Sequence, residues 1–228
     1  MPPARIAAVA AALTLAAPAP VAAARAPSRA DRPVSVTIVG DSVAASIEQA
    51  PRARALLRRG LRTRFDARVC RRLAGPGCPY QGATPPGALE AVRAAGRALG
   101  DVLVVDVGYN DPSAGYRPAM RRIVRAAREQ GARAIVWVTL REAGRYRDEY
   151  VRTNAAIRAE AVRRPRVRVA DWNAFSRGRP WFARDGLHLS AAGALGLARF
   201  LRPAILRAAR RRASPPPQPA SARATTRA

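Results

Sequence analysis

The sequence predicts an α/β fold in which a five-stranded parallel sheet lies between two layers of helices. Five short apolar segments alternate along the chain with longer segments whose apolar residues recur at helical spacing. Strands that alternate with helices are typical of parallel sheets, and right-handed crossovers place the helices on both faces. At 228 residues, the chain is expected to form about one such domain.

The first strand is predicted at residues 34–39, because this run is apolar and mostly β-branched. Gly40 ends the run and lets the backbone turn steeply. Asp41 and Ser42 are then left at the carboxyl end of the strand, which is the edge where open parallel sheets bind ligands. Gly-Asp-Ser is also an ordinary turn sequence, so partners elsewhere in the chain must decide between the two interpretations.

A second strand is predicted at residues 65–69, where apolar and charged side chains alternate and indicate a half-exposed strand near a sheet edge. Before it, Pro51 interrupts any long helix, and the leucines of residues 53–61 are spaced as in a helix. After it, residues 70–87 are rich in Gly and Pro and are predicted to form a loop.

The most apolar run after residue 24, residues 102–107, predicts the central strand of the sheet. Helices are predicted on either side of it, at residues 88–99 and 117–130. The strand ends in a cluster of turn-forming residues, 108–112, which falls at the same sheet edge as Ser42.

The last part of the domain repeats the alternation, with a strand at 134–140, a helix at 146–163, a strand at 167–172 and a loop at 173–189. Ser190 is expected to cap a final helix over residues 191–210. Pro203 should kink that helix or split it in two.

Both ends of the chain are predicted to lie outside the domain. Arg5, a short apolar segment and small residues before a cleavage site after Ala24 are typical of a secretory signal peptide. An uncleaved membrane anchor is the alternative, although the apolar segment is short for a bilayer. The predicted division is a signal peptide at 1–24, a linker at 25–32, the domain at 33–210 and a disordered basic Pro/Ala-rich tail at 211–228. The protein is therefore expected to be secreted or extracytoplasmic.

The two cysteines, Cys70 and Cys78, fit such a compartment. A pair of cysteines in an oxidising space is expected to form a disulfide, with two free thiols as the alternative. The bridge would hold the Gly/Pro-rich loop in shape. No CxxC pair or His-rich cluster occurs in the sequence, so no metal site is predicted.

The formal charge of +26 indicates attraction to polyanions, but it does not specify a partner. Every one of the 41 basic residues is arginine, and alanine and proline are also frequent. This composition is typical of a GC-rich genome, which weakens the charge as an argument for nucleic acid. We expect no specific nucleic-acid partner, a peripheral attraction to an anionic cell envelope, and a monomer.

A serine nucleophile needs a base within hydrogen-bond reach and a carboxylate that orients the base. His188 is the only imidazole in the chain, and Asp185 precedes it by three residues. One tight turn can lay that carboxylate against the ring nitrogen that faces away from Ser42. Asp-x-x-His is a common pattern, however, and a single histidine is more often a structural residue.

The third group of candidate residues is Gly108-Tyr109-Asn110-Asp111, directly after the central strand. An asparagine amide and backbone N–H groups can stabilise the negative oxygen of a tetrahedral intermediate. Taken alone, the cluster is an ordinary turn. Together with Ser42 after the first strand and Asp185 and His188 before the last helix, it stands where a single active site at the sheet edge requires it.

In these three motifs the sequence resembles the SGNH hydrolases, also called the GDSL esterase and lipase family. The order of elements is similar over residues 34–210, with Val43 where the family most often has leucine. The resemblance implies a flavodoxin-like fold and an enzyme that needs no cofactor. It implies that Ser42 is the nucleophile and an oxyanion donor, Asn110 a second donor, Asp185 the orienting acid and His188 the base.

The family's remaining oxyanion donor is the N–H of a single glycine, and its match in this sequence is ambiguous. Gly82, in the loop after the second strand, is the preferred candidate. Gly75, Gly77 and Gly87 remain alternatives.

The sequence therefore predicts a secreted serine hydrolase or acyltransferase that acts on oxygen esters of a small molecule or glycan. The absence of long hydrophobic insertions favours short acyl groups on polar substrates such as cell-envelope glycans. The alternative is a non-catalytic basic surface protein that binds envelope polyanions. Hydrolysis of a small acetate ester that is lost on replacing Ser42 would distinguish the two.

Overall fold

A computed structural model describes residues 32–210, and its sheet has five parallel strands in the order β2-β1-β3-β4-β5. The strands are β1 (Val34–Gly40), β2 (Leu61–Ala67), β3 (Val102–Asp106), β4 (Ala134–Val138) and β5 (Val167–Ala170). This order has its topological switch between β1 and β3, where open parallel sheets bind ligands. The predicted fold class is thus confirmed.

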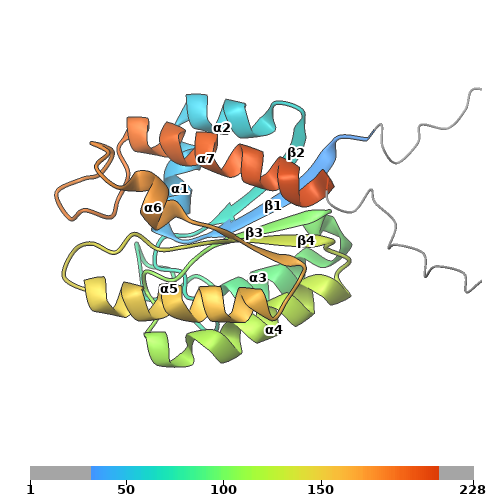
Figure 1. Ribbon diagram of the computed structural model, residues 1–228, viewed down its shortest axis with the longest axis horizontal. Coiled ribbons are helices and arrows are strands. Elements are labelled where there is room, and N and C mark those ends of the chain that lie inside the picture. Colours follow the sequence, from blue (N-terminus) through green and yellow to red (C-terminus); the bar gives the residue numbers. More distant parts are fainter. Residues whose placement is uncertain (1–31, 211–228) are drawn as a thin grey trace, which may run out of the picture. The chain divides into compact units, whose positions relative to one another are not determined.

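Helices cover both faces of the sheet (Figure 1). One face carries α1 (Ser42–Gln49), α2 (Pro51–Arg58) and α7 (Ala191–Arg210), and the other carries α3 (Ala88–Ala95), α4 (Tyr116–Glu129) and α5 (Arg147–Val162). Short helical segments complete the chain, namely α6 (Trp172–Ser176) and the 3₁₀ turns η1 (Gly96–Leu99) and η2 (Ser113–Gly115).

The core consists of two apolar layers, one on each side of the sheet. Alternate residues of β3 point to opposite layers, so that Leu103 and Val105 pack with α3 and α4, whereas Val102 and Val104 pack with α7. All five residues of β3 and of β4 are buried. A strand that is covered on both faces needs the continuous apolar run that the sequence has here.

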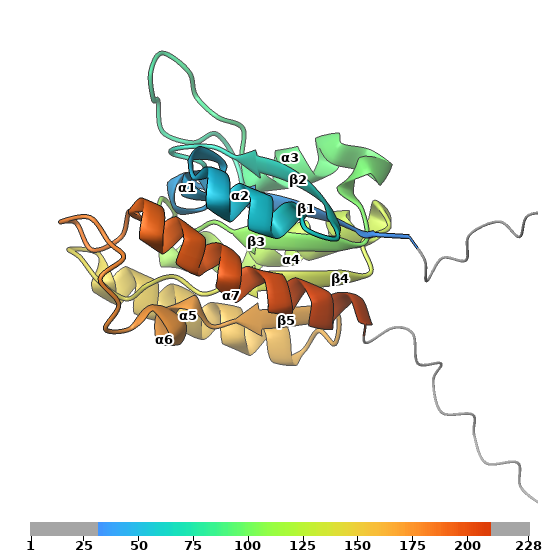
Figure 2. The same ribbon diagram turned by 90° about the horizontal axis from the view of Figure 1, so that it is seen from above.

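The second strand begins earlier than the sequence predicts. It spans Leu61–Ala67 rather than 65–69, because Leu61 pairs with Val34 at the start of β1. The helix before it accordingly ends at Arg58, where the alternating pattern of the strand takes over. In Figure 2 the loop that follows β2 projects from the body of the domain before the chain enters α3.

Two further differences concern the last part of the chain. The fifth strand ends at Ala170 rather than at 172, and a short helix, α6, follows it where the sequence predicts the end of that strand and the start of a loop. The helix is capped by Asp171, whose side chain accepts a hydrogen bond from the Ala174 N–H. The final helix is continuous through Pro203, so of the two predicted effects, a kink or a split, the split does not occur. Pro203 is exposed, so water can hydrate the carbonyl that its missing N–H leaves free.

The predicted signal peptide, the linker up to residue 31 and the tail lie outside the described residues. Within residues 32–210, no helix combines the length and the apolar character that crossing a bilayer requires. Cys70 and Cys78 form the predicted disulfide, with their Cα atoms 5.1 Å apart.

Candidate active site

Ser42 is the first residue of α1 and directly follows the tight turn at the end of β1. A Cβ atom at Gly40 would lie 2.1 Å from the Ala44 Cβ, so only glycine allows the helix to start this close to the strand. The hydroxyl group of Ser42 is consequently held at the carboxyl edge of the sheet.

Asp41 connects this turn to the loop that follows β3. Its carboxylate is fully buried and accepts hydrogen bonds from the N–H groups of Val43 at 3.0 Å, Gly108 at 3.1 Å and Tyr109 at 3.2 Å. The side chain therefore caps α1 and also fixes the segment that carries Asn110. The sequence predicts Asp41 only as a turn residue, although an Asp before a helix start is a recognised capping signal.

Burial dominates the titration of the acids beneath the site. It raises the pKa of Asp41 to about 6, and the three backbone N–H groups limit the rise. Asp106, at the end of β3, is also buried, and neither of its carboxyl oxygens has a hydrogen-bond partner among the described residues. Burial and the nearby Asp41 raise the pKa of Asp106 well above its ordinary value, which favours the neutral acid.

Asp41→Asn is expected to change how stability depends on pH. Between pH 3.8 and about 6, the folded protein holds a proton on Asp41 that the unfolded chain releases. The free energy of unfolding of wild type minus that of Asp41→Asn should therefore fall by up to about 3 kcal/mol as the pH rises from 3 to 7. Urea denaturation at several pH values measures it, and a difference that is constant or grows with pH would contradict the expectation.

His188 lies between Asp185 and Ser42. Its Nδ1 atom is 2.6 Å from the Asp185 Oδ2, and its Nε2 atom is 3.0 Å from the Ser42 Oγ. The other oxygen of Asp185 accepts hydrogen bonds from the N–H groups of Leu187 at 2.9 Å and of His188 at 3.0 Å. The structure thus brings together Ser42, Asp185 and His188, the three side chains that the sequence predicts to meet at one site.

The charge state of Asp185 follows from these contacts. Partial burial opposes ionisation, but hydrogen bonds from the His188 ring and from the Leu187 and His188 N–H groups outweigh it and lower the pKa of Asp185 to about 2. A carboxylate at this position accepts the Nδ1 proton of His188. That tautomer leaves Nε2 with a lone pair facing the Ser42 hydroxyl.

The segment that carries Asp185 and His188 is anchored by Trp181, which lies in the predicted loop 173–189 but is not among the predicted site residues. The Trp181 carbonyl accepts hydrogen bonds from the Ser190 N–H at 2.8 Å and the Ser190 hydroxyl at 3.0 Å, which closes the segment at its base. Its ring stacks on Trp172, with 5.8 Å between ring centroids, and contacts Gly196 of α7. A Cβ atom at Gly196 would lie 2.9 Å from two carbon atoms of this ring.

Asn110 is held against the start of the loop that follows β2. Its side-chain amide donates to the Arg71 carbonyl at 3.1 Å, and its own carbonyl accepts from the Arg72 Nε at 3.2 Å. The next residue, Asp111, accepts from the Leu73 N–H at 2.9 and 3.0 Å. The Asn110 amide has two N–H groups, so this network leaves one donor for another acceptor.

Gly82 lies farther along the same loop, in an exposed turn closed by a bridge between Tyr80 and Ala83. None of the hydrogen bonds of Asn110 involves it. In the turn that does contact Asn110, Cys70 has a φ of 65°, a left-handed conformation that glycine adopts most readily. The choice of Gly82 as an oxyanion donor stays a prediction.

The described residues contain no group of three or more His, Cys, Asp or Glu side chains placed to hold a metal ion. Ser42, His188 and Asp185 instead form a hydrogen-bonded chain suited to activating a hydroxyl group.

The model of the GDSL-like lipase/acylhydrolase family matches residues 38–194. This range contains all three groups of the candidate site. No curated protein matches the sequence significantly.

Three solved structures illustrate the shared fold. The C-terminal catalytic domain of peptidoglycan O-acetyltransferase A from Streptococcus pneumoniae is 23% identical with a TM-score of 0.57, over 77% of this chain and 95% of that one. A carbohydrate acetylesterase family member from Sinorhizobium meliloti is 17% identical with a TM-score of 0.62, over 77% and 99%. A putative arylesterase from Agrobacterium tumefaciens str. C58 is 16% identical with a TM-score of 0.61, over 76% and 99%.

Proposed function

We propose that this chain, which belongs to the GDSL-like lipase/acylhydrolase family, is an extracytoplasmic serine esterase or acyltransferase that acts on short acyl esters of glycans. Membership of the family makes it an enzyme of the ester hydrolase type, and the proposal concerns the residues, the substrate and the compartment. Ser42 is the nucleophile, His188 the general base and Asp185 the acid that orients it.

The position of His188 is the observation that carries the proposal. Both of its ring nitrogens are within hydrogen-bond distance of a partner, one from the loop before α7 and one from the first residue of α1. A structural histidine has no need for a serine hydroxyl on one side and an ionised aspartate on the other. The arrangement supports proton transfer from Ser42.

The reaction then follows from the geometry. The Ser42 oxygen attacks the ester carbonyl carbon while His188 accepts the hydroxyl proton, and the Asn110 amide and the Ser42 N–H stabilise the oxyanion. The tetrahedral intermediate collapses, the C–O bond to the alcohol breaks, and His188 gives its proton to the departing oxygen. Water attacks the acyl-enzyme in the same way and releases the acid, or a second alcohol attacks and completes an acyl transfer.

The proposed substrate class is supported by the similar structures, by the disulfide and by the basic surface of the protein. Two of the similar structures are described as a peptidoglycan O-acetyltransferase and a carbohydrate acetylesterase. The disulfide between Cys70 and Cys78 supports an oxidising compartment, where such glycans occur. A basic surface would also concentrate the enzyme near anionic glycans.

A panel of acyl esters tests this proposal. The full chain is assayed with 4-nitrophenyl esters of increasing acyl length and with O-acetylated glycan fragments, in the presence and absence of an acceptor alcohol. We expect kcat/KM to be highest for acetyl esters and acetylated glycans. A steady rise in kcat/KM with acyl length would contradict the short-acyl assignment, and the absence of hydrolysis throughout would contradict the serine esterase.

Gly196→Ala is expected to slow turnover without contacting the substrate. The added methyl group overlaps the Trp181 ring, so the base of the segment that holds Asp185 and His188 must shift. Misplacement of a catalytic group by about 1 Å can lower kcat by about 100-fold, and KM should change less. Gly115→Ala is the matched control, because a Cβ atom there meets nothing within 4 Å. Equal kcat values in two folded variants would exclude this role of Trp181.

The contacts of Asn110 favour the Cys70 turn over Gly82 as the source of the third oxyanion donor. No hydrogen bond from the Cys70 N–H occurs within residues 32–210, and the turn lies beside Gly40, whose carbonyl accepts from the Arg68 N–H at 3.0 Å. The side chain of Cys70 is tied to Cys78, which helps to hold the turn in its left-handed conformation.

Three variants separate these candidates. In a Cys78→Ser background, Cys70→Gly should keep more turnover than Cys70→Val, since a β-branched residue disfavours the left-handed conformation by about 1–2 kcal/mol. Gly82→Val, at a φ of 77°, should leave turnover nearly unchanged. The opposite pattern, with loss only in Gly82→Val, would return the role to Gly82.

A further inference from the structure

A cleft rich in arginine lies at the amino-terminal edge of the sheet, opposite the edge that carries Ser42. Its walls come from the starts of β4 and β5 and from the ends of α4, α5 and α7. Six of its lining residues are arginines, namely Arg128, Arg133, Arg163, Arg164, Arg166 and Arg168. Its volume of about 490 Å³ is in the range of small-molecule binding sites.

Carboxylates neutralise only part of this charge. Arg133 pairs with Asp101 at 3.5 Å, and Arg164 pairs with Glu160. Glu160 is itself shared with two further arginines outside the cleft, Arg117 and Arg121. Across the described part of the chain, no carboxylate forms an ion pair with Arg128, Arg163 or Arg168.

The ends of two helices offset part of the positive charge that the carboxylates leave in the cleft. The C-terminal end of a helix carries about half a negative elementary charge, and α4 and α5 both end beside the cleft. Arginine stays charged at any pH the protein meets. A concave surface that gathers several such groups concentrates its field on whatever lies inside.

We propose that this cleft binds a compact oxyanion with three or more negative charges, of which a chain of phosphate groups is the simplest form. Guanidinium groups match phosphate oxygens with paired N–H donors, and such charge-assisted hydrogen bonds are stronger than neutral ones. All strands of a parallel sheet start at one edge and end at the other. The cleft lies at the edge where they start and Ser42 at the edge where they end, so an anion in the cleft does not block the candidate active site. The phosphate groups come either from a free oligophosphate or from an anionic polymer.

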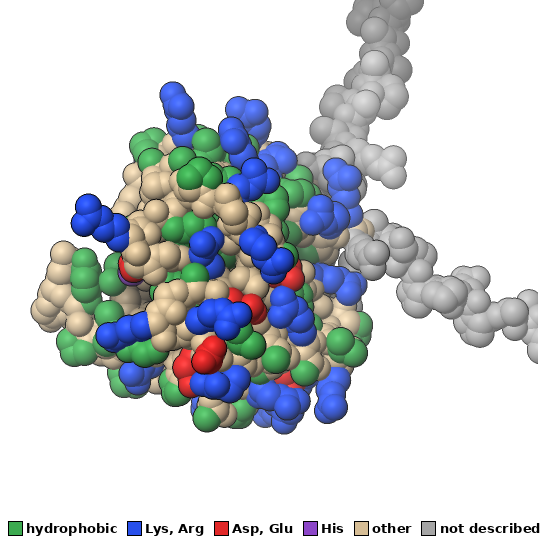
Figure 3. Space-filling model, turned by 60° about the vertical axis from the view of Figure 1, so that its left-hand side comes forward, with side chains coloured by type: hydrophobic (Ala, Val, Ile, Leu, Met, Phe, Trp, Pro, Cys, Tyr) green, Lys and Arg blue, Asp and Glu red, His purple; other side chains and the backbone are tan. Residues whose placement is uncertain are grey.

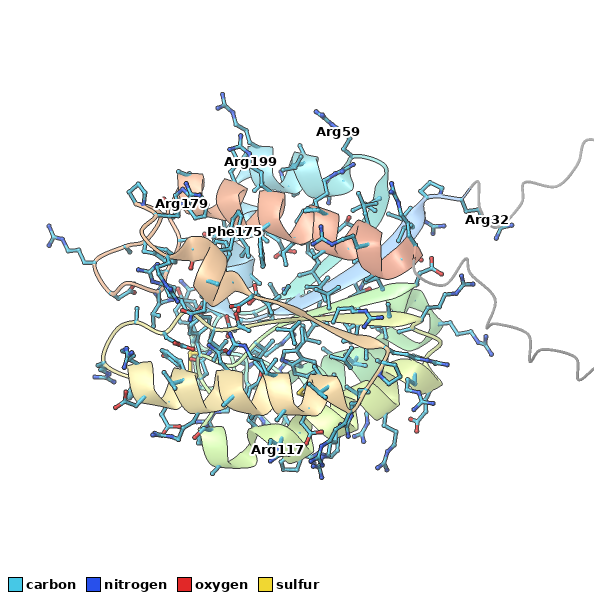
Figure 4. The ribbon with its side chains drawn as sticks, in the orientation of Figure 1. Arg32, Arg59, Arg117, Phe175, Arg179 and Arg199 are labelled. Carbon is cyan, nitrogen blue, oxygen red and sulfur yellow. A yellow bond between two sulfur atoms is a disulfide. The ribbon has the colours of Figure 1, made fainter. Side chains whose placement is uncertain are left out.

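The test must separate the cleft from the general charge of the surface, because arginines also cover the face that Figure 3 brings forward. The cleft variant is Arg128→Gln/Arg163→Gln/Arg168→Gln. The matched control is Arg59→Gln/Arg62→Gln/Arg199→Gln, which removes the same charge. In Figure 4, Arg59 and Arg199 extend away from the body of the domain on the side of α2 and α7.

Binding of tripolyphosphate to the full chain is measured by calorimetry at constant ionic strength. We expect saturable binding that the cleft variant weakens by about tenfold or more and the control by less than about twofold. Ester hydrolysis should stay the same in both variants. Equal weakening in both variants, no saturable binding to wild type, or inorganic phosphate binding as tightly as tripolyphosphate would each overturn the proposal.

A long-chain polyphosphate distinguishes the two sources. If long-chain polyphosphate binds more tightly per phosphate group than tripolyphosphate does, the natural ligand of the cleft is a polymer. If the two bind equally tightly per phosphate group, the natural ligand is a free oligophosphate. The cleft variant must lose binding in either case for the proposal to stand.

Discussion

Ser42→Ala and His188→Ala are each expected to lower kcat for ester hydrolysis by about four to six orders of magnitude. The two side chains act as one unit, because His188 removes the proton only while it is hydrogen-bonded to Ser42 at 3.0 Å. The double variant should therefore be little slower than either single variant. Losses that multiply would mean that the residues do not share a mechanism.

The fold should survive both changes, so that the loss can be assigned to chemistry. Ser42 is only partly buried and His188 is exposed, so neither truncation leaves a cavity in the core. Circular dichroism and the thermal midpoint serve as controls. A fluorophosphonate probe should label wild type at Ser42 and leave Ser42→Ala unlabelled. Labelling of Ser42→Ala at another serine would show that this other serine is the nucleophile.

The central part of the fold was predictable because burial on both faces demands a continuous apolar run. The segment around Val104 has that run, and it forms the middle strand of the sheet. The edge strand β2 was placed too late because only its pairing with β1, which begins at Val34 and Leu61, determines where it starts. Local alternation of residues does not contain that information.

The chain of Ser42, His188 and Asp185 was predictable for a similar reason. Each residue sits at the carboxyl end of a strand or just before a helix, and a parallel sheet brings such positions to one edge. The supporting contacts of Trp181 were not predictable, since they depend on how closely α7 approaches the ring at Gly196. Asp41 lies between these cases, because its capping role has a local signal but its bonds to Gly108 and Tyr109 arise only in the folded chain.

Asn110→Asp is expected to reduce turnover more than Asn110→Ala, and this comparison decides whether the residue stabilises the oxyanion. If Asn110 only shapes the turn, aspartate should replace it well, because both residues favour the same turn positions. If its amide faces the oxyanion, aspartate substitutes a negative acceptor for a donor beside developing negative charge. Removing one such donor typically lowers kcat by about 100- to 1000-fold, and a like charge should lower it further.

The Michaelis constant separates this role from a structural one. An oxyanion donor acts mainly in the transition state, so KM should stay within a few-fold of wild type in both variants. If Asn110 were only a turn residue, losing its hydrogen bond to the Arg71 carbonyl would shift the loop and would change KM and the stability together. Both variants should remain folded by circular dichroism. Near-normal turnover of Asn110→Asp would remove Asn110 from the mechanism and leave only Ser42, His188 and Asp185.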